Sequence, residues 1–92
     1  MERSIYKYTL ELTNTQSLAI PCGAEILTVQ MQGVTPCIWA LVDPNVLRVK
    51  RQFFMYGTGH PVRNDNLDLH SYVGSFQVNA GEEVYHLFEE KE

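Results

Sequence analysis

Polar and apolar side chains alternate with a period of two along most of this chain. From Tyr6 to Leu12 every second residue is aromatic or aliphatic, and the residues between them are polar. Consecutive side chains of an extended chain point to opposite faces, so this period is typical of β-strands. A similar alternation, or a short apolar run, recurs at 18–20, 25–32, 37–42, 46–56, 71–78 and 83–88. No long segment follows a helical period, and we therefore predict an all-β fold.

Turn-forming residues separate these segments at the spacing of a small antiparallel fold. Asn14 lies in a polar cluster, Gly33 and Pro36 flank a short connection, and Gly81 follows an asparagine. Short strands separated by such turns every eight to twelve residues indicate a sandwich or barrel. At 92 residues the chain is long enough for one core only. We predict one β domain over residues 1–92, an antiparallel sandwich or open barrel of six to seven short strands, with 89–92 as a frayed, charged tail.

Four of the predicted strands carry more specific expectations. In 25–32 the alternation places Leu27, Val29 and Met31 toward the core. The run 37–42 has no polar residue, so we expect it to be covered on both faces, with Trp39 packed in the core. In 46–56 the basic half is expected to be solvated, and Gly74, inside 71–78, indicates a bulge or a close backbone approach.

Charge and composition restrict the classes of partner and compartment. Eleven acidic against seven basic residues give a net charge of −4, which disfavours non-specific binding to nucleic acid. A local basic patch is still compatible with one small anion. No apolar run approaches the ~20 residues that span a bilayer, so we expect a cytoplasmic protein with no membrane partner. Cys22 and Cys37 form no metal-binding pair; two free thiols are the favoured interpretation, with a single disulfide left open.

The loop after residue 56 combines glycines with titratable and cationic side chains. Thr58 lies between Gly57 and Gly59, and His60 and Arg63 follow. Glycine amides and a guanidinium suit an oxyanion or phosphate, and a histidine beside a hydroxyl suits general-base chemistry. The loop matches no nucleotide-binding or nucleophile-elbow motif, and a simple turn is the alternative.

The remaining polar residues indicate no metal or cofactor site. Asp65, Asp68 and His70 follow no metal-ligand spacing, so we expect a solvated acidic loop and no cofactor. His86 lies in an alternating strand, where packing or hydrogen bonding at the sheet surface is expected.

Five tyrosines are many for so short a chain, and tyrosine suits an interface because its ring offers contact area with a polar tip. These residues are Tyr6, Tyr8, Tyr56, Tyr72 and Tyr85. A small all-β domain also has unpaired sheet edges. Together, these features predict a homo-oligomer.

Several segments carry a resemblance to a known family. They are Ile5-Tyr6-Lys7-Tyr8, Pro21-x-Gly23-Ala24-x-Ile26-Leu27, the run from Pro36 to Pro44, Tyr56-Gly57-Thr58-Gly59-His60-Pro61, 72–77 and 84–88. In these segments, which extend over nearly the whole chain, the sequence resembles a family of short proteins encoded by bacteriophages and prophages. The resemblance implies a phage setting and a compact fold, and it carries over no catalytic residue.

We expect a binding protein rather than an enzyme. It would hold a host protein or a small anionic, nucleotide-like ligand, as a counter-defence inhibitor or a sponge, in the host cytoplasm. The residues expected to bind are Tyr56, Thr58, His60, Arg63, Arg48, Lys50 and Tyr72. One alternative is a virion or assembly component that oligomerises through its sheet edges. The other is a small hydrolase that uses His60 with Thr58 or a metal.

Overall fold

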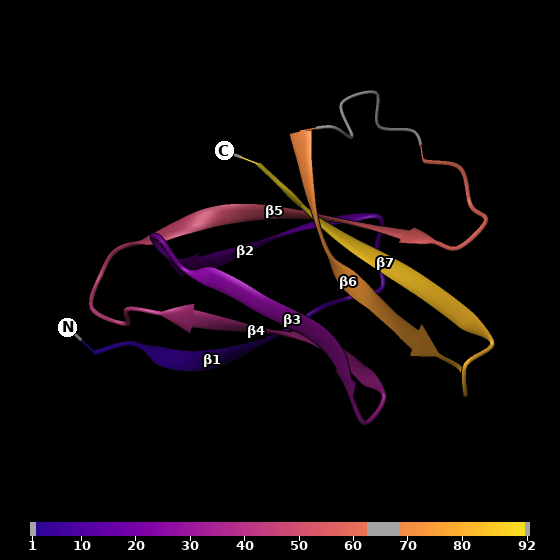
Figure 1. The fold of residues 1–92 in the computed structure, drawn as a ribbon, viewed down its shortest axis with the longest axis horizontal. Coiled ribbons are helices and arrows are strands. Elements are labelled where there is room, and N and C mark those ends of the chain that lie inside the picture. The colour runs from indigo at the N-terminus through magenta and orange to yellow at the C-terminus, as the bar shows by residue number, and fades with distance from the viewer. Residues whose placement is uncertain (1, 63–68, 92) are drawn as a thin grey trace.

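A computed structural model describes residues 2–62 and 69–91 and confirms the all-β prediction. Its strands are β1 (Ser4–Thr9), β2 (Thr15–Pro21), β3 (Glu25–Gln32), β4 (Thr35–Val42), β5 (Arg48–Gly57), β6 (His70–Val78) and β7 (Glu83–Glu90). They form two antiparallel sheets, which we call sheet A (order β1-β4-β3) and sheet B (order β2-β5-β7-β6) (Figure 1). The fold is therefore a small sandwich and not a closed barrel. No helix in the described part of the chain is long and apolar enough to cross a membrane.

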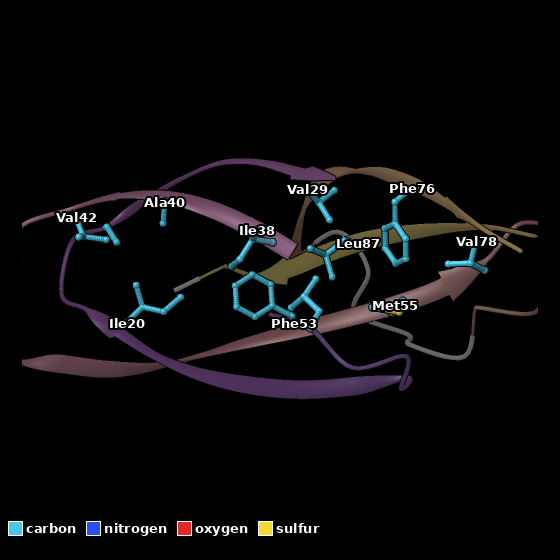
Figure 2. Close-up of a cluster of buried hydrophobic side chains, with 12 residues drawn as sticks. Ile20, Val29, Ile38, Ala40, Val42, Phe53, Met55, Phe76, Val78 and Leu87 are labelled. Atoms are coloured by element: carbon cyan, nitrogen blue, oxygen red, sulfur yellow. The ribbon is translucent and has the colours of Figure 1, made fainter. Parts of the chain in front are cut away.

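The hydrophobic core lies between the two sheets. Figure 2 shows side chains of both sheets pointing into this space. Ile38, Ala40 and Val42 of β4 are fully buried, as are Phe53 of β5 and Leu87 of β7. These residues occupy alternate positions of their strands, as the period of two predicts. Within 2–62 and 69–91, no third layer of strands or helices packs on the opposite face of either sheet.

Trp39 was expected in the core, and this prediction is wrong. Trp39 lies between Ile38 and Ala40, which both point inward, so its own side chain is on the outer face of sheet A. There it is paired with Lys7 of β1 and Thr28 of β3 and is half-buried. The expectation that 37–42 is covered on both faces holds in part: Cys37, on the same face as Trp39, is fully buried, whereas Trp39 and Leu41 are only half-buried.

A bulge changes the expected pattern in β3. The register with β4 shifts between Ile26 and Thr28. Ile26 and Val29 therefore both pack against the core, while Leu27, expected inside, is 42% exposed. An extra residue in one strand reverses the alternation that follows it.

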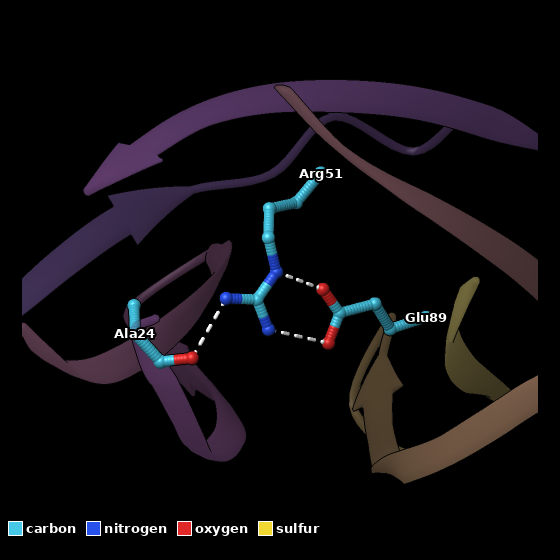
Figure 3. A network of polar contacts seen from close by, with 3 residues as sticks. All are labelled: Ala24, Arg51 and Glu89. Atoms are coloured by element: carbon cyan, nitrogen blue, oxygen red, sulfur yellow. Dashed lines mark hydrogen bonds and ion pairs between the residues drawn. The ribbon is translucent and has the colours of Figure 1, made fainter. Parts of the chain in front are cut away.

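An ion pair closes one end of the core (Figure 3). Arg51 occupies an inward position of β5, where its guanidinium binds both carboxylate oxygens of Glu89 in β7; the Nη2–Oε1 distance is 2.9 Å. Arg51 Nη1 also donates to the carbonyl oxygen of Ala24 at 2.7 Å. The two charged side chains are each only 13% exposed. The expectation of a solvated basic half therefore holds for Arg48 and Lys50, which are exposed, and is wrong for Arg51.

The same contact corrects the expected start of the tail. β7 continues to Glu90, so Glu89 belongs to the sheet instead of to a frayed segment 89–92. Its carboxylate is held by Arg51, and its backbone pairs with Phe53 and Ser71. The two cysteines are free thiols, as favoured: Cys22 is exposed and Cys37 is buried.

Gly74 was expected to mark a bulge or a close backbone approach, and the structure confirms both. The register between β6 and β7 shifts between Tyr72 and Gly74, and a Cβ atom at Gly74 would lie 3.1 Å from Cγ1 of Val29. β6 thus approaches β3 of the other sheet closely at this glycine.

We expect Gly74→Ala to lower the free energy of unfolding by about 1–2 kcal/mol, because the added methyl group overpacks the core against Val29. Urea denaturation monitored by circular dichroism measures this loss. In a Val29→Ala background the methyl group has room, and the same substitution should cost less. An equal cost in both backgrounds would contradict the close approach.

Candidate functional site

The outer face of sheet B carries a cluster of rings that we call the ring patch. Its members are Phe54 and Tyr56 of β5, His70 and Tyr72 of β6, and His86 and Phe88 of β7. The register places Phe54 and Tyr72 on either side of Phe88, and Tyr56 opposite His86. Because Phe53, Met55 and Leu87 point into the core, their neighbours in the strands point outward.

The rings contact one another in T-shaped and tilted arrangements. The centroid of Phe88 lies 5.1 Å from that of Tyr72 and 5.9 Å from that of Tyr56, both in T-shaped arrangements. At the other end of the patch, the ring centroids of Phe54 and His70 lie 4.3 Å apart. Edge contacts are favourable for aromatic rings and leave ring faces open. Tyr72 is 55% exposed, so part of its ring is open to a ligand.

His86 joins two hydroxyl groups within the ring patch. Its Nε2 atom lies 2.6 Å from Oγ1 of Thr58, and its Nδ1 atom lies 2.8 Å from the hydroxyl oxygen of Tyr72. A neutral imidazole donates from one nitrogen and accepts at the other. One hydroxyl therefore gives its proton to the ring, while the other accepts from the ring and keeps a proton to donate outward. In either tautomer the array offers one free donor to a ligand.

A tight turn positions Thr58 for this contact. The amide of His60 donates to the carbonyl oxygen of Gly57 at 3.0 Å, and Gly59 has a φ of 84°, which favours glycine. The amide of Thr58 donates to the carbonyl oxygen of Val84 at 2.9 Å, which fastens the turn to β7. Residues 57–60 therefore form a tight turn at the end of β5.

The imidazole of His60 packs directly on Gly57. A Cβ atom at Gly57 would lie 2.5 Å from Nδ1 of His60, so the absence of a side chain leaves the space that the ring occupies. His60 is exposed, and the histidine that contacts Thr58 is His86. The hydroxyl–histidine pair is thus real, but its histidine differs from the one expected.

The whole chain, residues 1–92, matches the model of a family described as a domain of unknown function, DUF7352. The chain belongs to the DUF7352 family. No curated protein and no solved structure matches it.

The structure of this DUF7352 domain unites some of the expected binding residues and separates others. Tyr56, Thr58 and Tyr72 lie together around His86 and Phe88. Arg48 and Lys50 lie on the same face of β5, but Lys50 precedes Tyr56 by six residues, or roughly 20 Å of strand. Neither cation therefore belongs to the ring patch. Arg63, Asp65 and Asp68 lie outside the described residues.

Sequence reasoning placed His86 at the sheet surface, which is confirmed, but missed its role in this DUF7352 domain. The outward positions of 83–88 were readable from the alternation. That β7 lies between β5 and β6 was not readable, because the turn signals indicate only the β6–β7 hairpin. Sequence reasoning did not predict that β5 pairs with β7, because these strands are not consecutive in the chain.

Proposed function

We propose that this protein is a phage-type accessory protein that binds a small, nucleotide-like anion on the ring patch and does not catalyse a reaction. The observation that carries the proposal is the Thr58–His86–Tyr72 array beside the exposed ring of Tyr72. Bases stack on aromatic side chains with about 1–3 kcal/mol per base. A base on Tyr72 would also find one hydroxyl donor and further oxygen acceptors at its edge.

The charge of the chain favours a small ligand over a polymer. A net charge of −4 opposes binding to a long phosphate backbone, whereas one nucleotide depends on local contacts. His60 is not assigned to this ligand, because its ring packs where a side chain of Gly57 would lie, and Gly57 opposes Tyr85, which faces the core side of sheet B. Arg63 follows the same turn in the sequence and is the cation we assign to this ligand. In the host cytoplasm, such a protein would act as a sponge for a nucleotide signal or as a counter-defence inhibitor.

Isothermal titration calorimetry against a panel of mono-, di- and cyclic nucleotides tests this proposal. Tyr72→Phe removes the hydroxyl partner of His86 and should weaken binding about 5–30-fold. Tyr72→Ala removes the stacking surface as well and should weaken binding further. Lys50→Ala is the control, because Lys50 lies outside the ring patch, and it should leave the affinity unchanged. If Lys50→Ala weakens binding as much as Tyr72→Phe does, the ring patch is the wrong location.

A host protein is the alternative ligand class for the same surface, because tyrosine-rich patches also suit protein interfaces. Absence of heat with every nucleotide, together with retention of one host protein that Tyr72→Ala abolishes, would replace the nucleotide with a protein partner. The binding role and the location would then stand.

One observation favours a hydrolase as a second candidate. The 2.6 Å distance from Thr58 Oγ1 to His86 Nε2 is that of a hydroxyl nucleophile and its general base. Against this, the amides of Thr58 and His60 are already bonded to Val84 and Gly57, so neither is available to an oxyanion. Release of nitrophenol from ester and phosphodiester substrates decides the matter. A hydrolase requires turnover that Thr58→Ala and His86→Gln abolish and that Thr58→Ser retains.

A further inference from the structure

The outer edge of β1 presents unpaired backbone groups. Among the residues that the structure describes, β1 is the edge strand of sheet A and pairs only with β4. The amide of Leu10 donates to the carbonyl oxygen of Pro36 at 2.9 Å, directly beyond the strand. Hydrogen-bonded and non-hydrogen-bonded pairs alternate in an antiparallel ladder, so Tyr8, Tyr6 and Ser4 also bond to β4. The N–H and C=O groups of Ile5, Lys7 and Thr9 therefore point away from the sheet.

β1 has none of the usual features that prevent an edge strand from pairing with another strand. β1 contains no proline, and its register with β4 has no shift. Lys7, its central charge, is turned across the sheet to the side-chain oxygen of Gln32, so the ammonium group does not guard the edge. The other edges are interrupted: β2 ends in Pro21, and β3 and β6 carry register shifts. Bulges, prolines and edge charges are the devices that prevent strand pairing.

The side chains of β1 are also more exposed than an isolated domain requires. Ile5 is 61% exposed on the outer face of sheet A, and Tyr6 is 41% exposed on the inner face. Apolar groups thus stand open on both sides of the same unpaired backbone. Another strand beside β1 would cover both.

We propose that β1 pairs antiparallel with β1 of a second copy of this chain about a two-fold axis, which joins two A sheets into one. The axis is perpendicular to the sheet, so opposed residues share a face and the register is centred on a single residue. If the axis passes through Lys7, the two Lys7 residues face each other and place like charges in opposition. If it passes through Ile5, only residues 4–6 of the two β1 strands are paired. A centre at Tyr6 avoids both problems.

The Tyr6-centred register uses the free edge groups of Ile5 and Lys7. Ile5 forms a hydrogen-bonded pair with the partner's Lys7, and Lys7 forms one with the partner's Ile5. Tyr6 then faces the partner's Tyr6 in a non-hydrogen-bonded pair, where side chains approach most closely. This interface is independent of ligand binding, because the ring patch lies on sheet B.

Sedimentation equilibrium of the full chain tests the pairing. The wild type should show a concentration-dependent dimer. Lys7→Pro removes an outward N–H group, and with it two intermolecular hydrogen bonds by symmetry, so it should weaken the dimer at least about tenfold. Lys7→Ala keeps the N–H group and should remain dimeric. A wild type that stays monomeric at millimolar concentration, or a dimer insensitive to Lys7→Pro, would overturn the proposal.

A charge swap at the symmetry centre tests the register without introducing proline. Tyr6→Glu and Tyr6→Lys should each be monomeric, because like charges oppose each other across the axis, and an equimolar mixture should form a heterodimer. Native mass spectrometry distinguishes the three species. Failure of the mixture to associate would exclude the Tyr6-centred register even if Lys7→Pro is too unstable to measure.

Discussion

Phe53→Ala is expected to lower the free energy of unfolding by about 3–5 kcal/mol. Phe53 is the largest fully buried side chain among the described residues, and its ring lies between the two sheets (Figure 2). Its removal loses apolar burial and leaves a cavity that β2 and β7, paired on both sides of β5, cannot collapse to fill. A domain of this size has a total stability of about 5–14 kcal/mol, so the variant should be close to unfolding.

Urea titration and thermal melting monitored by circular dichroism measure this effect, with a melting temperature lower by roughly 15–30 °C. Phe54→Ala is the matched control, since it removes the same side chain from the next position, which points to the half-buried outer face. We expect it to cost about 1 kcal/mol through loss of the contact with the His70 ring. Equal losses for the two variants would mean that the faces of β5 are assigned incorrectly.

Arg51→Met should lower the free energy of unfolding by about 2–4 kcal/mol. The substitution removes the guanidinium that binds the carboxylate of Glu89 and the carbonyl oxygen of Ala24, so both acceptors lose their donor in a place with little water (Figure 3). The pair closes the core where β5 and β7 meet the start of β3. Loss of one partner leaves a charge that the surroundings no longer compensate.

Two comparisons separate this effect from a general effect of removing a cation. Lys50→Met, one position earlier and exposed, should change stability by no more than about 0.5 kcal/mol. The double variant Arg51→Met with Glu89→Met should recover much of the loss, because an apolar pair replaces the buried ion pair. If Arg51→Met costs no more than Lys50→Met, the ion pair does not stabilise the sandwich.

The two proposed interactions use different surfaces and are compatible in one molecule. The ring patch lies on the outer face of sheet B, whereas the free edge of β1 belongs to sheet A. Pairing through β1 would create a dimer with two separate ring patches. Each patch would bind its own ligand, so calorimetry should give a stoichiometry of one ligand per chain.

Much of the fold followed from local patterns, and the errors have specific causes. The alternation identified all strand regions, and the glycines identified the turns after β3, β5 and β6. The placement of Trp39 failed because an apolar run reports the hydrophobicity of both faces and not which face meets a second layer. Arg51 and Glu89 were placed in solvent because a charge in a pattern carries no sign of a partner 38 residues away.

The candidate site was predictable residue by residue but not as an arrangement. Tyr56, Thr58 and Tyr72 were selected from the sequence, and His86 was placed at the sheet surface. Their meeting depends on β7 pairing with both β5 and β6, which is a property of strand order. Arg48 and Lys50 were grouped with them because they share a face, although distance along the strand separates them.

The amino-acid sequence by itself determined the strands and the turns between them, because these depend on side chains only a few residues apart. The tertiary structure alone decided which strands are neighbours, and hence that His86 joins Thr58 to Tyr72, that Arg51 binds Glu89 and that β1 has a free edge. These contacts link distant parts of the chain, and their geometry follows from how the two sheets pack, which no local pattern encodes.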